Sequence, residues 1–275
     1  GFMLQEGWSN YLMGPDAKAT WTQWRDRNLT AGRTARRVDG DVCVITDIRD
    51  HAPSWRKSMV TALLLAAGNH MAYSREADRS FLSLASRYCD LIYGDALRWL
   101  SVEDAARMFQ VDAGGRPVWW QEYVRCLPVA PGKRIYLVHL INPPEGEWIN
   151  ESKEPKPLKD LCVSVTLPQG WKPTQAWLVG AERHRPFVEA VVGQTRRNDG
   201  REEPYLERLC EPTGTPSAEP LPLDGNAVRV SEVKLWGIAA IECEGPAADA
   251  LPSDVRPQFP APRIPDPNAA IKAVT

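Results

Sequence analysis

The feature that most constrains the fold is a β-α-β pattern in residues 40–74. Residues 42–45 form a short apolar run rich in β-branched side chains, which is typical of a strand buried on both faces. Pro53 begins a helical pattern, Gly68 ends it, and a second short strand follows at residues 70–73. Two strands joined by a helix in this way belong to a parallel sheet. The pattern therefore predicts an α/β fold for this part of the chain.

Similar patterns lie on both sides of this unit. Residues 2–4 resemble the end of a buried strand, and residues 18–38 and 78–100 have the apolar period of helices. Three parallel strands cannot close a (β/α)8 barrel, which needs eight. We therefore expect residues 1–100 to be the last three β/α units of such a barrel, in a chain whose N-terminal part is missing. A self-contained small α/β sheet is the alternative.

From residue 101 the apolar pattern changes to short alternating runs separated by Pro and Gly, which predicts an antiparallel β-sandwich over residues 101–246. The polar, Pro-rich residues 193–225 are expected to form a long loop, and the Pro-rich residues 247–275 a disordered tail. The predicted strands are residues 118–127, 134–141, 161–167, 174–179, 187–192, 227–233 and 236–242.

Composition excludes several kinds of partner and cofactor. A net charge of −2 gives no electrostatic reason to expect nucleic acid, and no window is apolar over the length of a membrane-spanning helix, so neither partner is expected. The six cysteines are scattered without a CxxC pair, which predicts reduced thiols and no zinc site. No Gly-rich phosphate loop is present, and no cofactor is expected. Localisation, secreted or cytoplasmic, and oligomeric state stay open.

Carboxylates follow two of the predicted strands. Glu6 comes after the first and Asp47 after the second, so both would project from the edge where parallel α/β folds place their chemistry. Paired carboxylates cleave glycosidic bonds, although strand-end carboxylates also cap helices and bind Arg. Asp50 and His51 would hydrogen-bond sugar hydroxyls, or form a surface ion-pair cluster with Arg49.

The order of several motifs resembles the C-terminal half of glycoside hydrolase family 66, which comprises dextranases and cycloisomaltooligosaccharide glucanotransferases. The resemblance covers roughly residues 6–242 and is strongest at HLIN (139–142) and LWGIAAIE (235–242). The other matching motifs are GNHMAYS, SRYCDLIYGDAL, IYLVHLINPP with the downstream Trp148, PLKDLCVSVTLP and QAWLVGAE.

This resemblance implies a retaining (β/α)8 hydrolase followed by a β-sandwich. The family has an Asp nucleophile after the fourth strand and a Glu acid/base after the sixth, so Glu6 falls at the acid/base position and the nucleophile would lie upstream of this chain. His70, after the eighth strand, matches a sugar-facing His of the family, but Gly68-Asn69 replaces the family's Gly pair here, which leaves the α-1,6-glucan substrate unassigned.

The resulting hypothesis is the C-terminal part of a retaining glycoside hydrolase that acts on an α-glucan or related polysaccharide. Its partner would be a polysaccharide or oligosaccharide, and this chain alone is expected to be inactive. The alternative is a non-catalytic carbohydrate-binding or structural protein on the same scaffold. Besides Glu6, the expected sugar-contacting residues are Trp8, Asp47, Asp50, His51, Asn69 and His70.

Two aromatic features lie in the predicted sandwich. His139 falls within an alternating strand, which favours a hydrogen-bonded core histidine over a functional one. Trp119 and Trp120 are adjacent and could form a sugar platform. Since neighbours in a strand point to opposite faces, at most one of them would be exposed.

Overall fold

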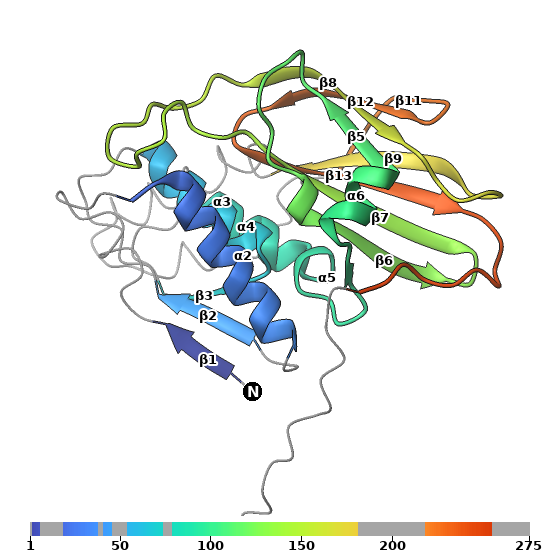
Figure 1. The fold of residues 1–275 in the computed structure, drawn as a ribbon, viewed down its shortest axis with the longest axis horizontal. Coiled ribbons are helices and arrows are strands. Elements are labelled where there is room, and N and C mark those ends of the chain that lie inside the picture. The colour runs from blue at the N-terminus through green and yellow to red at the C-terminus, as the bar shows by residue number, and fades with distance from the viewer. Residues whose placement is uncertain are drawn as a thin grey trace, which may run out of the picture.

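The computed structural model describes residues 2–5, 19–37, 41–45, 54–73, 79–180 and 218–254. These residues form four layers: a parallel sheet, a layer of helices, a six-stranded antiparallel sheet and a four-stranded antiparallel sheet (Figure 1). Apart from the short strand β4 (Arg98–Trp99), the first hundred residues supply the parallel sheet and the helices that cover it. The helices therefore lie between two sheets of different kinds.

The parallel sheet contains β1 (Phe2–Gln5), β2 (Asp41–Ile45) and β3 (His70–Tyr73), in that order. Both neighbouring pairs are parallel, as the alternation of strands and helices predicted. The described residues form three strands of this sheet and no barrel. The α/β part of the expected fold is thus confirmed, whereas membership of a larger barrel stays a prediction.

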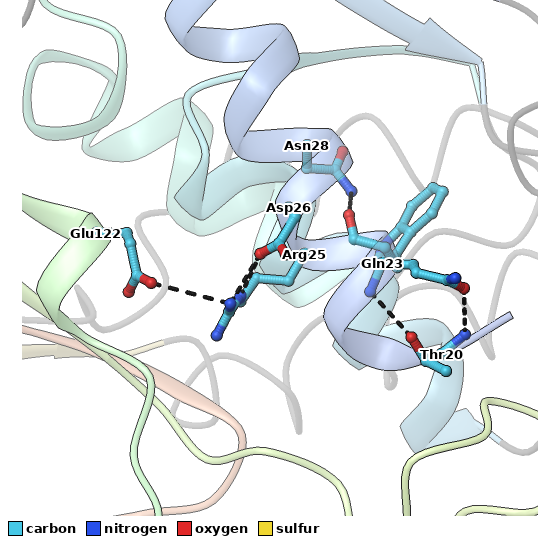
Figure 2. A network of polar contacts seen from close by, with 7 residues as sticks. Thr20, Gln23, Arg25, Asp26, Asn28 and Glu122 are labelled. Carbon is cyan, nitrogen blue, oxygen red and sulfur yellow. Dashed lines mark hydrogen bonds and ion pairs between the residues drawn. The ribbon is translucent and has the colours of Figure 1, made fainter.

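Helices α2 (Trp21–Arg37) and α3 (Ser54–Ala66) connect these strands. A reciprocal cap fixes the start of α2 (Figure 2): the Gln23 N–H donates to Thr20 Oγ1 at 3.1 Å, and the Thr20 N–H donates to Gln23 Oε1 at 3.0 Å. One turn further on, the Asn28 amide donates to the Trp24 carbonyl at 2.8 Å. On α3, the side chains of Val60, Leu63 and Leu64 are inaccessible to solvent.

The predicted third helix, residues 78–100, is shorter than expected. It consists of α4 (Arg79–Arg87) and the single turn α5 (Cys89–Ile92), after which the chain turns into β4. Gly94 marks the change, because a Cβ atom at this position would lie 2.5 Å from the Asp90 carbonyl oxygen. This close approach leaves no room for a side chain at the point where the helix ends.

Two antiparallel sheets form the predicted sandwich. The strand orders are β10-β9-β13-β7-β6-β4 in the six-stranded sheet and β11-β12-β8-β5 in the four-stranded sheet. Besides β4, these sheets contain β5 (Phe109–Asp112), β6 (Val124–Ala130), β7 (Lys133–Ile141), β8 (Leu158–Val165), β9 (Lys172–Gly180), β10 (Glu219–Pro220), β11 (Leu223–Asp224), β12 (Ala227–Val233) and β13 (Trp236–Glu244).

The six-stranded sheet is buried on both faces. On β7, Leu137 and Ile141 pack against the helices, while Val138 and Leu140 pack against the four-stranded sheet. Such double burial explains why the sequence of β7 is an almost continuous apolar run rather than a strict alternation. The consequence is one core shared between the helices and the sandwich, and a second core inside the sandwich.

Some elements differ from the sequence-based expectation. Helix α6 (Val102–Met108), capped by Ser101, was not predicted, and the first part of the predicted strand 118–127 contains the 3-10 helix η1 (Gln121–Tyr123) instead. Residues 247–254 of the predicted disordered tail pack on the sandwich, where the Trp171 indole donates to Asp249 at 2.6 Å. The predicted strand 187–192 lies outside the described residues, as do most of the loop 193–225 and residues 255–275.

Candidate functional site

The candidate site is the edge of the parallel sheet at which β1 and β2 end. Gln5, the last residue of β1, pairs with Val44, and β2 ends one residue later at Ile45. Both strands therefore deliver the following chain to the same edge, which is where Glu6 and Asp47 follow in sequence. The residues Glu6, Trp8, Asp47, Asp50 and His51 themselves lie outside the described part of the chain.

His70 lies at the start of its strand, and not at the carboxyl edge of the sheet where it was expected. It is the first residue of β3 and pairs with Cys43 in the middle of β2, rather than following a strand at its carboxyl end. Its ring stacks on Tyr93, with ring centres 4.0 Å apart and an interplanar angle of 19°. The imidazole is half-buried and is oriented by the segment that follows α5.

Asn69 is fully buried, with 0% of its surface exposed. Its amide donates to the Asn28 carbonyl on α2 at 3.0 Å, and its own carbonyl accepts from the Tyr93 hydroxyl at 3.3 Å. Burial raises the pKa of Tyr93, so the phenol stays protonated and available as a donor. In this structure Asn69 holds the turn between α3 and β3 in place and does not face solvent.

Gly68, in the same turn, has a positive φ of 72°. A Cβ atom there would lie 2.8 Å from Cζ2 of Trp99, which is closer than a side chain tolerates. Both the backbone conformation and the packing therefore require glycine at this position. The Gly68-Asn69 pair, which stands where family 66 has a pair of glycines, thus has a structural role in this chain.

Arg125 is the residue of this region that sequence reasoning missed. It lies on β6 with 0% exposure, and its guanidinium donates to the Ile92 carbonyl at 3.1 Å and to the Ala66 carbonyl. These carbonyls end α5 and α3, where the helix dipole is negative. Burial, and then the positive charge of Arg36, lower the pKa of Arg125. A charged residue inside an otherwise apolar strand was the available signal.

His139 is a core residue, as the sequence predicted. It is fully buried, and its Nδ1 accepts a hydrogen bond from the Trp236 indole at 3.3 Å, while Nε2 has no partner among the described residues. Burial, and secondarily the charge of Arg125, hold the pKa of His139 well below its ordinary value. The ring is therefore neutral at pH 7, with its proton on Nε2.

Trp119 and Trp120 do not form a platform. Both are half-buried, and they pack against different cores, Trp119 against the helices and Trp120 inside the sandwich. The guanidinium carbon of Arg25 lies 5.0 Å from the centre of the Trp119 ring, and Arg25 also approaches Glu122 at 3.9 Å (Figure 2). These contacts join α2 to the sandwich. The opposite directions of the two indoles agree with the expectation for neighbouring residues.

Among the described residues, no group of three or more His, Cys, Asp or Glu side chains lies close enough together to hold a metal ion. None of the helices described is both long and apolar enough to cross a membrane.

Comparison with known proteins gives distant likeness among solved structures alone. No protein-family model matches the sequence, and no curated protein does. Among solved structures, the chain is similar to a cycloisomaltooligosaccharide glucanotransferase from Paenibacillus sp. in complex with cycloisomaltoheptaose, with a TM-score of 0.44 and 11% sequence identity. The likeness covers 71% of this chain and 27% of that protein, so the chain spans about a quarter of its length.

Proposed function

We propose that this chain is the C-terminal part of a retaining glycoside hydrolase that acts on an α-glucan or a related polysaccharide. In this proposal residues 1–100 supply the last three β/α units of a catalytic barrel and residues 101–246 its sandwich. The observation that carries it is the common edge of β1 and β2, because Glu6 and Asp47 follow these strands directly. Parallel α/β sheets hold their catalytic groups at this edge.

Two further observations support the proposal. The strands β1 and β3 have no partner on their outer sides among the described residues, and parallel sheets are normally extended and covered. The motifs that resemble family 66 also run in the same order through the β/α units and the sandwich. Under this assignment Glu6 is the general acid/base, and the nucleophile lies upstream on an earlier strand.

The decisive experiment uses the complete gene product and the substitution Glu6→Gln, which removes the proton donor while keeping the side-chain size. We expect hydrolysis of dextran or another α-glucan to fall by at least about 100-fold. Activated aryl glycosides should lose less activity, because their leaving groups depart without protonation. Glu103→Gln, at an exposed position on α6 of the sandwich, is the matched control. Unchanged activity of Glu6→Gln would remove Glu6 from the mechanism.

A second candidate, a non-catalytic carbohydrate-binding protein on the same scaffold, is favoured by one observation. Asn69 and His70, two of the expected sugar contacts, are engaged in holding the turn between α3 and β3 and in stacking on Tyr93. A gene product that binds α-glucan oligosaccharides but turns over neither glucans nor aryl glycosides would support this candidate against the enzyme.

A further inference from the structure

Trp148 is the one aromatic residue among the exposed large apolar side chains of the described residues. Its exposed fraction is 43%, and the other two members of this group are Val129 and Leu251. A single exposed apolar residue is ordinary on protein surfaces and has no meaning by itself. The position and the fixation of Trp148 distinguish it from the other two.

Trp148 lies in the loop between β7 and β8, residues 142–157, and is paired by its neighbours to the start of α2. The Trp21 N–H donates to the Glu147 carbonyl at 3.0 Å, and the Ile149 N–H donates to the Ala19 carbonyl at 3.0 Å. Trp148 itself forms an antiparallel bridge with Thr20. The backbone on both sides of the exposed indole is thus anchored to another layer of the protein.

The loop is also fixed from within. The Trp148 carbonyl accepts hydrogen bonds from the N–H groups of Glu151 at 3.1 Å and Ser152 at 2.9 Å. The Ser152 hydroxyl in turn accepts from the buried Trp21 indole at 2.8 Å and donates to the Ile149 carbonyl. An aromatic side chain on such a fixed turn loses little conformational freedom when a ligand stacks on it.

This turn lies at the edge of the parallel sheet that carries the candidate site. It contacts the first turn of α2 and, through a 3.3 Å hydrogen bond from Arg56 to the Asn150 carbonyl, the first turn of α3. Helices that follow parallel strands begin at the carboxyl edge of the sheet. Figure 1 shows the arrowheads of β1 and β2 and the beginnings of α2 and α3 on one side of the molecule, with the loop between β7 and β8 above them.

The chemistry around Trp148 suits a neutral sugar. Three carboxylates, Glu145, Glu147 and Glu151, are exposed on the same loop, and carboxylate oxygens accept hydrogen bonds from hydroxyl groups. The face of an indole packs against the C–H face of a pyranose ring, whereas its N–H reaches a polar group at the rim. An aromatic plate with acceptors beside it can hold one sugar unit without charge complementarity.

We propose that Trp148 is a sugar-stacking subsite of an α-glucan, contributed by the sandwich to the carboxyl edge of the parallel sheet. The inference rests on the proposed function for the identity of the sugar. Trp148 lies in a loop of the sandwich, whereas the other expected sugar-contacting residues lie in the β/α units of the first hundred residues. Its role is to hold a glucose unit beyond the cleaved bond, and the chemistry of bond cleavage does not involve it.

The test is a titration of the 275-residue chain with isomaltoheptaose and with maltoheptaose, followed by the indole N–H signals of its tryptophans in nitrogen-resolved NMR. Trp148→Phe identifies the signal of Trp148. We expect that signal to shift with at least one oligosaccharide, and Trp148→Ala to raise the Kd about three- to tenfold. Trp148→Phe should bind within about twofold of the original chain, since it keeps a stacking ring.

Val129→Ala is the matched control, because Val129 is also an exposed apolar side chain and lies at the far end of β6. It should leave the Kd unchanged. The proposal is overturned if Trp148→Ala binds as tightly as the original chain, if neither oligosaccharide moves the Trp148 signal, or if that signal responds only to tetramethylammonium, which would indicate a cation site.

Failure of this inference can be told apart from failure of the proposed function. A complete gene product that depends on Glu6 but keeps its KM for long glucans after Trp148→Ala would refute only the subsite. Oligosaccharide binding that depends on Trp148 in a protein without turnover would refute only the catalysis. If the catalytic function and the subsite are both correct, Trp148→Ala raises KM for long glucans and leaves kcat on activated aryl glycosides unchanged.

Discussion

The guanidinium carbon of Arg125 lies 4.1 Å from the centre of the Trp99 ring, with the cation stacked over the indole. The same guanidinium donates to the carbonyls that end α3 and α5. One side chain of the sandwich thus satisfies two helix ends of the neighbouring layer and stacks on the indole of Trp99, its cross-strand partner on β4. Because these groups are neutral, the positive charge is stabilised by dipoles and by the indole instead of by a carboxylate.

The first prediction is that Arg125→Met destabilises the chain by about 3 kcal/mol, since hydrogen bonds to a charged group are lost and two buried carbonyls are left without donors. Arg125→Lys should lose less unfolding free energy than Arg125→Met, because its ammonium group can still donate to one carbonyl but cannot reach both and stack on the indole. Urea unfolding measures both. Arg116 also donates to two carbonyls, both at 2.7 Å, but is exposed, so Arg116→Met should cost less than about 1 kcal/mol. Equal losses at the two positions would contradict the argument.

The second prediction concerns Gly68→Ala. The alanine would have to adopt a positive φ, and its Cβ would collide with the Trp99 ring. We therefore expect a loss of about 3 kcal/mol in unfolding free energy, of which about 1 kcal/mol comes from the backbone conformation. Gly114→Ala is the control, because Gly114 has a similar φ of 63° and no heavy atom within 4 Å of a new Cβ. If the two variants unfold at the same urea concentration, the contact with Trp99 does not matter.

A third prediction follows from the neutral His139. Its pKa is lowered in the folded state, so between that value and the ordinary histidine pKa of about 6.5 the unfolded chain binds more protons. The contribution of the neutral His139 to the unfolding free energy is fully present above pH 6.5 and is lost as the pH falls. We expect about 1 kcal/mol of unfolding free energy to be lost between pH 6.5 and 5.5 through this residue.

His139→Gln tests this third prediction, because glutamine accepts from Trp236 without titrating in this range. Carboxylates contribute equally to both proteins, so the difference in pH dependence isolates the histidine. Urea midpoints at pH 7.5, 6.5 and 5.5 suffice. Parallel pH profiles for the variant and the original chain would mean that His139 is protonated in the folded state without cost.

The fourth prediction is that residues 101–254 will not behave as an independent soluble unit. Leu137, Ile141 and Trp236 on the six-stranded sheet are buried by the helices of the first hundred residues, and removing those helices would expose them. The isolated segment should bind a fluorescent apolar dye strongly and self-associate in sedimentation experiments. A monomeric segment with a cooperative unfolding transition would contradict this prediction.

Much of this architecture is readable from sequence periodicity. The apolar stripes of α2 and α3 and the long apolar runs of β7 and β13 follow directly from residue spacing, because burial selects the residue types. The end of the helix at Gly94 and the short helix α6 were harder, since they depend on a close approach of backbone and on a single Ser101 cap. Local contacts of this kind leave little trace in the apolar pattern.

The candidate site was less predictable than the fold. Glu6 and Asp47 were placed after strands whose ends the structure confirms at one edge, and the side chains themselves lie outside the described residues. The level of His70 depends on the register between β2 and β3, which no spacing in the sequence reveals. The role of Arg125 depends on two helix ends far away in sequence, so it needed the three-dimensional arrangement.

The central place of β13 in the six-stranded sheet also affects how the chain is made. This strand lies between β9 and β7, and it is synthesised more than a hundred residues after the helices that pack on it. At roughly 5 to 20 residues per second, a ribosome needs on the order of 10 s to pass from α5 to β13. During that time β6 and β7 can already cover part of the helices, but the sheet lacks its central strand, so the surface of α4 that Trp236 covers through Phe81 stays exposed until β13 is made.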